Sequence, residues 1–196
     1  MSPIVAPTHI TLISHPATRE QKAGVFPLDE PLDLQTRATL ANIPWKAPRN
    51  ARMLTAPEHR TRQTAEALGL AATETSELCD CDFGRWRGRS LESLQTQELS
   101  GLSEWLSDVT AAPHGGESFC DLMTRVGVWL NTQRDAGIAI VVTHASVVRA
   151  AVVHALQAPL DTFLRIEIAP LTTTEIRFSG GAWRVRSIGV PFSSEF

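Results

Sequence analysis

The sequence contains no tyrosine, only two lysines and three cysteines, and no apolar run long enough to cross a membrane. Neither Lys22 nor Lys46 follows a glycine, so the Gly-Lys pair of a Walker-type phosphate loop is absent. Three cysteines are too few for a disulfide framework, and the first residues show no positively charged segment followed by an apolar run. We therefore expect a protein of the reducing cytoplasm.

The chain has an ordinary globular composition in which arginine supplies almost all of the positive charge. Its 196 residues are 43% hydrophobic and 20% charged, which suits one domain with a sizeable core. Sixteen of the eighteen basic residues are arginine, and the formal net charge is −3. A slightly acidic balance argues against nucleic acid or an anionic membrane as a partner.

The hydrophobic pattern alternates strands with helices and then changes to a run of antiparallel strands. Ile138–Thr143 is a continuous apolar run of the kind buried on both faces of a parallel sheet. Shorter strands are expected at residues 9–14 and 51–55, helices at 57–68, 118–134 and 145–156, and later strands at 163–169, 171–178 and 183–188. The pattern predicts a single α/β domain over residues 1–196. We expect a three-layer sandwich whose mostly parallel sheet has an antiparallel edge and helices on both faces.

Three of the expected strands are followed by residues that can do phosphate chemistry. His15 follows the first strand, the segment containing Arg60 follows the second, and His144 follows Ile138–Thr143. Ligands of open α/β sheets bind beyond the carboxyl ends of the strands, so these side chains are expected to meet. An imidazole can act as a nucleophile, and a guanidinium matches the geometry of phosphate.

Five blocks in a fixed order carry a resemblance to a known family. They are TLISHPAT at residues 11–18, TAPEHRTRQTAEAL at 55–68, LCDCDFGRWRG at 78–88, PHGGES at 113–118 and VVTHASVVRA at 141–150. In these blocks the chain resembles the histidine phosphatase, or phosphoglycerate mutase-like, superfamily. It is more similar to the phosphatase branch, near the alpha-ribazole phosphatases, than to the glycolytic mutase.

The resemblance implies a phosphohistidine mechanism. His15 would attack phosphorus and carry the phosphoryl group, while Arg60 and His144 hold its oxygens. Asp80 stands where the family has a glutamate; it would protonate the leaving oxygen and then activate water. Such a transfer depends on positioning and charge stabilisation, so we expect neither a metal nor another cofactor.

The chain also departs from the family pattern next to the expected nucleophile. Ser14 replaces a phosphate-binding arginine, and losing a charged hydrogen bond costs roughly 1.5–3 kcal/mol. Ser14 could still donate one neutral bond to phosphate, and Thr18 and Ala145, at further motif positions, are expected to line the phosphate site. We hypothesise that Arg19, within a turn of His15, supplies the missing guanidinium.

The expected function is phosphomonoester hydrolysis on a small phosphorylated metabolite, by a monomer or a homodimer. The alternative is an impaired family member that binds a phosphorylated ligand without turnover. A cysteine phosphatase is a weaker alternative, suggested by the five residues between Cys81 and Arg87. The arginines on either side of Trp86 could form a cationic lip over the site or an ordinary solvated loop.

Overall fold

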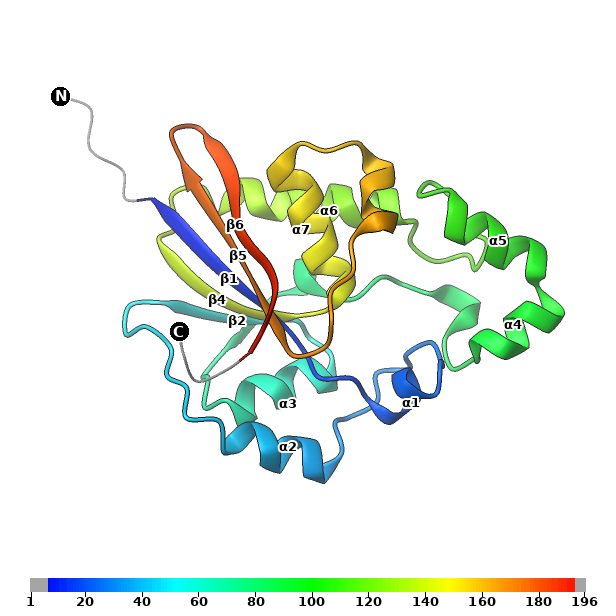
Figure 1. The fold of residues 1–196 in the computed structure, drawn as a ribbon, viewed down its shortest axis with the longest axis horizontal. Coiled ribbons are helices and arrows are strands. Elements are labelled where there is room, and N and C mark those ends of the chain that lie inside the picture. The colour runs from blue at the N-terminus through cyan, green and yellow to red at the C-terminus, as the bar shows by residue number, and fades with distance from the viewer. Residues whose placement is uncertain (1–6, 193–196) are drawn as a thin grey trace.

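A six-stranded mixed sheet forms the centre of the computed structural model, which describes residues 7–192 (Figure 1). Its strand order is β3-β2-β4-β1-β5-β6. The strands are β1 (Thr8–Ser14), β2 (Arg52–Thr55), β3 (Thr73–Glu74), β4 (Ile138–Thr143), β5 (Thr172–Ser179) and β6 (Ala182–Pro191). The strands β3, β2, β4 and β1 are parallel to one another. β5 pairs antiparallel with β1, and β6 pairs antiparallel with β5 at the edge of the sheet. The predicted mostly parallel sheet with an antiparallel edge is confirmed.

The two central strands are aligned so that their carboxyl ends coincide. In the parallel pair of β1 and β4, Ser14 lies opposite Thr143. β4 is buried at all but its first residue, as its unbroken run of apolar and β-branched residues predicts. The residues that follow these strands, His15 and His144, are therefore neighbours in space.

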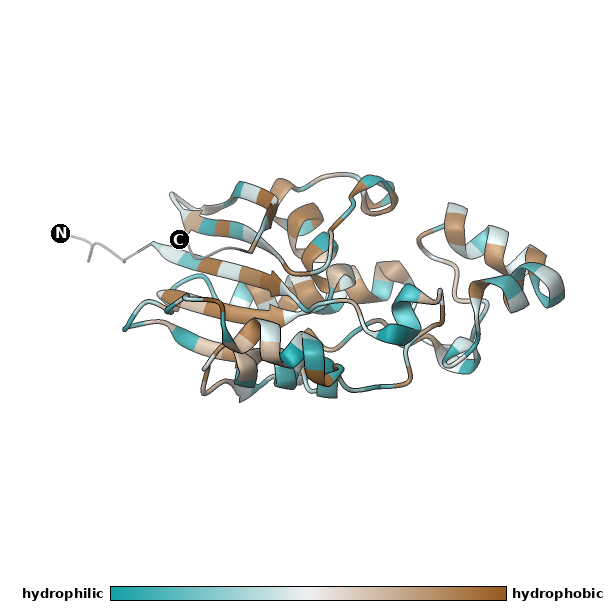
Figure 2. Ribbon diagram, turned by 60° about the horizontal axis from the view of Figure 1, so that its bottom comes forward, coloured by the Kyte–Doolittle hydropathy of each residue, from teal (hydrophilic) through white to brown (hydrophobic). Residues whose placement is uncertain are grey.

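Helices cover both faces of the sheet, which gives the predicted three layers (Figures 1 and 2). The helices α6 (Phe119–Thr132) and α7 (Ala145–Leu156) pack on one face, against side chains such as Leu12 and Val141. The helices α2 (Leu34–Ala41) and α3 (His59–Ala67) lie on the other face, where Ala65 of α3 joins Ile13 and Val142 in a second cluster. Strand side chains alternate between the two clusters because successive residues point to opposite faces of a sheet.

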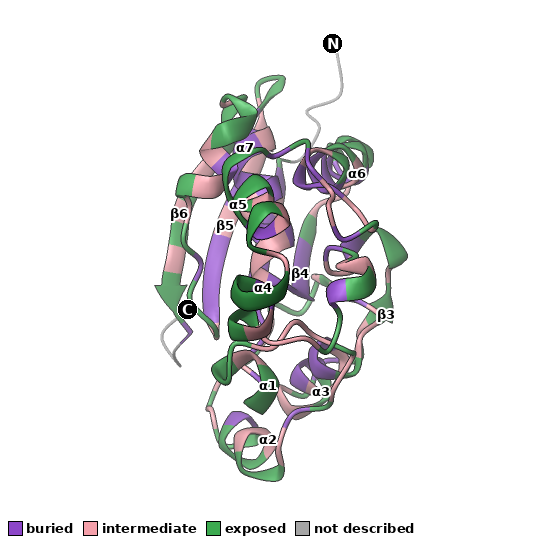
Figure 3. Ribbon diagram, turned by 90° about the vertical axis from the view of Figure 1, so that its right-hand side faces the viewer, coloured by how far each residue is buried: buried purple, intermediate pink, exposed green. Residues whose placement is uncertain are grey.

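A smaller helical arm extends beyond the carboxyl end of the sheet. It contains α4 (Leu91–Gln97) and α5 (Leu99–Ser107), which are largely exposed in Figure 3. The arm is attached through the short 3₁₀ helix at Gly84–Trp86, whose Trp86 side chain is fully buried against Leu94 and Leu102. Glu98 accepts hydrogen bonds from the Trp86 indole and from the guanidinium groups of Arg85 and Arg89.

The remaining helices are short. They are α1 (Arg19–Lys22) and the 3₁₀ helices Ser76–Leu78 and Leu160–Arg165. The prediction of a strand at 163–169 is wrong: residues 163–165 belong to the last of these 3₁₀ helices, with Phe163 buried against Phe119, and residues 166–169 form neither helix nor strand. The apolar residues of this segment face the core from a turn: Phe163 and Ile168 are buried in the same cluster as α6 and α7. In the described part of the chain, no helix has the length and apolar character needed to span a membrane.

Candidate functional site

The expected histidines meet beyond the carboxyl ends of β1 and β4. The ring centroids of His15 and His144 are 5.0 Å apart, and the rings are nearly perpendicular. Both side chains are buried, with exposures of 6% and 1%. Two imidazoles packed this closely, out of bulk water, can act on one small group bound between them.

His15 is held in the tautomer that a nucleophile requires. Its Nδ1 lies 2.7 Å from the carbonyl oxygen of Pro16, to which it donates its hydrogen, so the lone pair remains on Nε2. Burial, together with the positive charges of His144 and Arg60, places the pKa of His15 well below its usual range. The ring is therefore neutral at physiological pH, with a free nitrogen lone pair.

Arg60 and Asp80 form a buried pair beside the histidines. Arg60, from the first turn of α3, is 1% exposed, and its Nη2 donates to Asp80 Oδ2 at 2.8 Å. The other guanidinium nitrogens, Nε and Nη1, are buried and have no partner among the described residues. A buried donor without a partner is costly, which points to a ligand that accepts from it.

Asp80 is ionised in this arrangement. Its Oδ1 accepts from the Ser146 hydroxyl at 2.6 Å, and its Oδ2 accepts from Arg60. Burial works against ionisation of Asp80, but the charges of His144 and Arg60 outweigh it and hold the pKa of this carboxyl below its usual range. The carboxylate expected to act as the acid is thus held, in the absence of phosphate, by the charges of Arg60 and His144, which are expected to bind phosphate.

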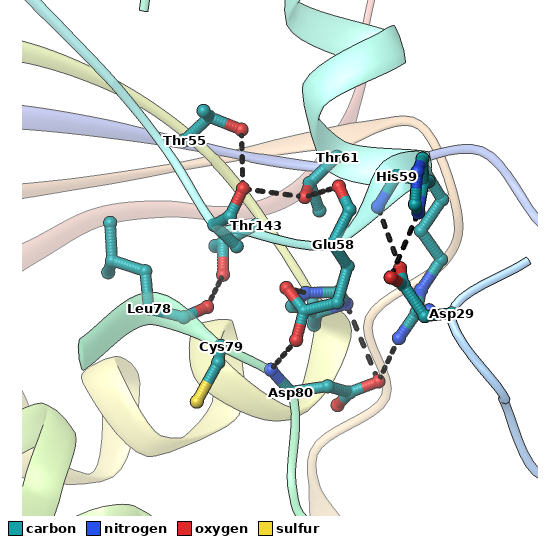
Figure 4. Close-up of polar contacts among 12 residues, drawn as sticks. Asp29, Thr55, Glu58, His59, Thr61, Leu78, Cys79, Asp80 and Thr143 are labelled. Carbon is teal, nitrogen blue, oxygen red and sulfur yellow. Dashed lines mark hydrogen bonds and ion pairs between the residues drawn. The ribbon is translucent and has the colours of Figure 1, made fainter. Parts of the chain in front are cut away.

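Glu58, which the sequence reasoning did not assign, completes the cluster (Figure 4). Its Oε2 lies 2.8 Å from His144 Nε2, and its Oε1 accepts from the backbone N–H of Asp80 at 2.9 Å. Burial opposes ionisation of Glu58, but hydrogen bonding to His144 and its charge lower the pKa of the carboxyl. The sequence held one signal for this role: an acidic residue two positions before Arg60, at a position that the motif leaves open.

The start of α7 supplies backbone donors to the same place. His144 is its N-cap residue, and no side chain caps the helix. The first N–H groups of a helix lack intrahelical partners, so those at Ala145 and the next residues remain available. Ala145 and Ser146 line a cavity of about 330 Å³ together with both histidines and Asp80.

The outer wall of this cavity is aromatic and basic. Phe83, Trp105 and Phe119 line it, as do Lys22 and Arg149. Arg149 stacks over Phe163 at 5.6 Å, makes no hydrogen bond or ion pair with any described residue, and has a buried Nε. The sequence contained Arg149 in the last motif block, but nothing in the pattern gave it a role.

Three other predicted phosphate ligands have different surroundings. The Ser14 hydroxyl donates to the carbonyl oxygen of Ala169 at 2.8 Å and accepts from the N–H of Thr172, which ties β1 to the start of β5. Thr18 caps α1 and donates to Glu30 at 2.8 Å. Arg19 is exposed on α1 and lines a separate surface hollow beside Asp33. The structure therefore brings together His15, Arg60, Asp80, His144 and Ala145. Ser14 lines the same cavity, although its hydroxyl is bonded to backbone groups, whereas Thr18 and Arg19 do not line it.

The cysteine alternative is not favoured by the surroundings of its thiol. Cys81 is 3% exposed, and its Sγ donates to the carbonyl oxygen of Glu117. Burial, followed by the charges of Asp80 and Glu117, raises the pKa of this thiol.

Two of the arginines around Trp86 bond within their own part of the chain. Arg85 and Arg89 form ion pairs with Glu98, which agrees with an ordinary loop more than with a cationic lip. Within residues 7–192, no three His, Cys, Asp or Glu side chains gather closely enough to hold a metal ion.

The chain is similar to curated and solved proteins over most of its length. The Bifunctional protein Rv2228c of Mycobacterium tuberculosis is 27% identical over 147 residues, which make up 70% of this chain and 40% of that protein. The chain thus spans about two fifths of the curated relatives it matches.

Solved structures share the fold at low sequence identity. YhfR of Bacillus stearothermophilus has a TM-score of 0.83 at 20% identity, covering 93% of this chain and 97% of that one. A putative alpha-ribazole-5′-P phosphatase of Escherichia coli has a TM-score of 0.82 at 19% identity, covering 95% and 98%. The mycobacterial glucosyl-3-phosphoglycerate phosphatase Rv2419c has a TM-score of 0.78 at 18% identity, covering 94% and 99%.

The order of the motif blocks and the paired histidines agree with the match to a family model. The model of the histidine phosphatase superfamily (branch 1) matches residues 10–191. The match runs from β1 to the end of β6 and so includes every residue of the cluster around His15. The chain belongs to the histidine phosphatase superfamily, branch 1.

Proposed function

We propose that this protein hydrolyses phosphomonoesters through a covalent phosphohistidine on His15. The observation that carries the proposal is the neutral His15 ring, whose free Nε2 lies in a cluster with the partnerless buried nitrogens of Arg60. The cavity of about 330 Å³ is at the small end of the range for ligand sites, which favours a small organic phosphate.

The first step forms a bond between His15 Nε2 and phosphorus while the bond from phosphorus to the leaving oxygen breaks. Arg60, His144 and the first amides of α7 hold the nonbridging oxygens and oppose their negative charge. These groups supply the charge stabilisation that a metal would otherwise give.

Asp80 supplies a proton to the leaving oxygen in this step. In the free site Asp80 is ionised, but a bound phosphoryl group draws on Arg60 and His144 and adds negative charge nearby. Both changes raise the pKa of the carboxyl and allow it to take up a proton. In the second step Asp80 accepts a proton from water, the water oxygen bonds to phosphorus, and the bond from phosphorus to His15 breaks.

The experiment compares the wild-type protein with His15→Asn on p-nitrophenyl phosphate. We expect turnover by the wild-type protein and none above background for the variant, with unchanged far-ultraviolet circular dichroism as the folding control. Binding of inorganic phosphate by a wild-type protein that shows no turnover would instead support a non-catalytic binder. The Ser14 hydroxyl, already bonded to Ala169, is the observation that favours this second function.

A further inference from the structure

The guanidinium group of Arg149 has no polar partner among the described residues, although it lines the cavity that contains His15. Its Nε is buried, and its guanidinium carbon lies 5.6 Å from the centroid of the Phe163 ring, which holds the group against the aromatic wall. Glu167 attracts this cation from an exposed position but forms no ion pair with it. A charged donor removed from water without an acceptor is costly, which points to a ligand that accepts from it.

Arg149 is placed away from the amides expected to hold the transferred phosphoryl group. It follows Ala145 by one turn on the same side of α7, since positions i and i+4 share a helix face. With a rise of 1.5 Å per residue, it lies about 6 Å farther along the helix axis. Apart from burial, the largest effects on the pKa of His15 come from the charges of His144 and Arg60. Arg149 therefore faces a part of the ligand other than the group that is attacked.

A second cation lines the same cavity. Lys22, the last residue of α1, is exposed, and its ammonium group makes no hydrogen bond or ion pair with any described side chain. Of the lining residues in the part of the chain that the structure describes, Asp80 is the only carboxylate, and it is paired with Arg60. The carboxylate of Glu58 is bonded to His144. The cavity wall thus keeps two positive charges that can bind an anion.

We infer that the substrate carries a second anionic group, a carboxylate or a second phosphate, which Arg149 binds with Lys22 beside it. The inference rests on the proposed function, because it names the class of phosphomonoester that reacts at His15. The planar pair of N–H donors of a guanidinium matches the oxygens of both anions. The aromatic side chains of the cavity limit access of water, which strengthens a charged hydrogen bond. Arg149 is thus a specificity-determining residue, which holds the part of the substrate that does not react.

The test compares phosphomonoesters that differ only in the group at the far end of a three-carbon chain. The probes are 3-hydroxypropyl phosphate, 3-phosphonooxypropanoate and 1,3-propanediol bisphosphate, and their five-carbon homologues provide a longer span. For the wild-type protein we expect kcat/KM to be about 10- to 100-fold higher for a probe with the second anion than for the hydroxyl probe, the value of one charged hydrogen bond. The carboxylate and bisphosphate probes show which anion the site prefers.

Substitutions of Arg149 show whether this ratio depends on its charge. Arg149→Met removes the charge but keeps an unbranched side chain that can cover Phe163, and we expect the ratio to fall close to one, mainly through a higher KM for the probes with the second anion. Arg149→Lys keeps the charge without the planar fork and is expected to keep part of the ratio. The matched control is Arg165→Met, an exposed arginine paired with Asp161, which should keep the wild-type ratio. The wild-type ratio itself tests the inference even if Arg149→Met fails to fold.

The outcomes separate this inference from the proposed function. A wild-type ratio near one at both chain lengths overturns the inference even if every probe is hydrolysed. An equal loss of kcat/KM for all probes in Arg149→Met also overturns it, because the guanidinium would then hold the transferred phosphoryl group. If no probe is turned over, calorimetry measures their binding instead. Tighter binding of the probes with the second anion, dependent on Arg149, then supports the inference and overturns the proposed hydrolysis, whereas equal binding of all probes overturns both.

Discussion

Replacement of Asp80 by asparagine tests the role of the acid directly. In the structure Asp80 Oδ1 accepts from the Ser146 hydroxyl and the Cys81 N–H, and Oδ2 accepts from Arg60. Asparagine keeps one of these oxygens and places an amide NH₂ against donors on the other side. It has no proton to give to a leaving oxygen and cannot take one from water.

The expected loss depends on the leaving group. General acid catalysis contributes about 10²- to 10⁴-fold, and an alkoxide needs the proton far more than a nitrophenolate does. For glycerol phosphate we expect Asp80→Asn to slow formation of the phosphoenzyme by that range. For p-nitrophenyl phosphate this step should slow by about tenfold or less, while hydrolysis of the phosphoenzyme becomes limiting.

The assay is rapid mixing with each substrate, followed by chemical quench. Asp80→Asn should release a burst of nitrophenolate close to one per site and then turn over slowly. The control is Asp82→Asn, an exposed neighbour whose side chain accepts a hydrogen bond from the N–H of Gly84 in the same loop; it should behave as the wild type does. An equal slowing of phosphoenzyme formation from both substrates would refute the role of Asp80 as proton donor.

Three further predictions concern stability and reactivity. Burial and the charges of His144 and Arg60 lower the pKa of His15 in the folded protein, whereas the ring has its ordinary pKa of 6.5 in the unfolded chain. As the pH falls below 6.5, the unfolded state therefore binds a proton that the folded state does not, and the folded protein loses stability. Urea unfolding at about pH 5.5 should show roughly 1.4 kcal/mol less stability from His15 than at about pH 7.5, and an equally steep pH dependence in His15→Asn would contradict this. Gly116→Ala should destabilise the fold by about 1–3 kcal/mol, because the new Cβ would collide with the carbonyl oxygen of Asp82; unchanged unfolding would refute that close approach. Iodoacetamide should leave turnover intact, because the Cys81 thiol is buried and its pKa is raised, and inactivation with label on Cys81 would revive the cysteine mechanism.

The sequence was sufficient for the fold and for the centre of the site because both depend on local patterns. The apolar run of β4 and the residues after β1 and β4 placed His15 and His144 at one edge, and the structure brings them together. The prediction of a strand at 163–169 was wrong because an alternating pattern also fits a 3₁₀ helix that buries one side chain, here Phe163 against Phe119.

Residue roles that depend on side-chain direction could not be predicted in this way. Arg19 is near His15 in sequence, but it begins a short helix that leaves it in solvent. Glu58 is an inconspicuous motif residue until the fold brings α3 against His144. Nearness along the chain was the available signal, whereas contacts between separate elements decide the chemistry.

Capture of the phosphoenzyme tests the central claim most directly. The protein is mixed with ³²P-labelled p-nitrophenyl phosphate, quenched in alkali and digested, and the labelled peptide is sequenced. The account predicts an acid-labile, alkali-stable phosphoryl group on His15 that forms and decays fast enough to account for turnover. Phosphoryl label on another residue, or turnover without any labelled intermediate on His15, would contradict it.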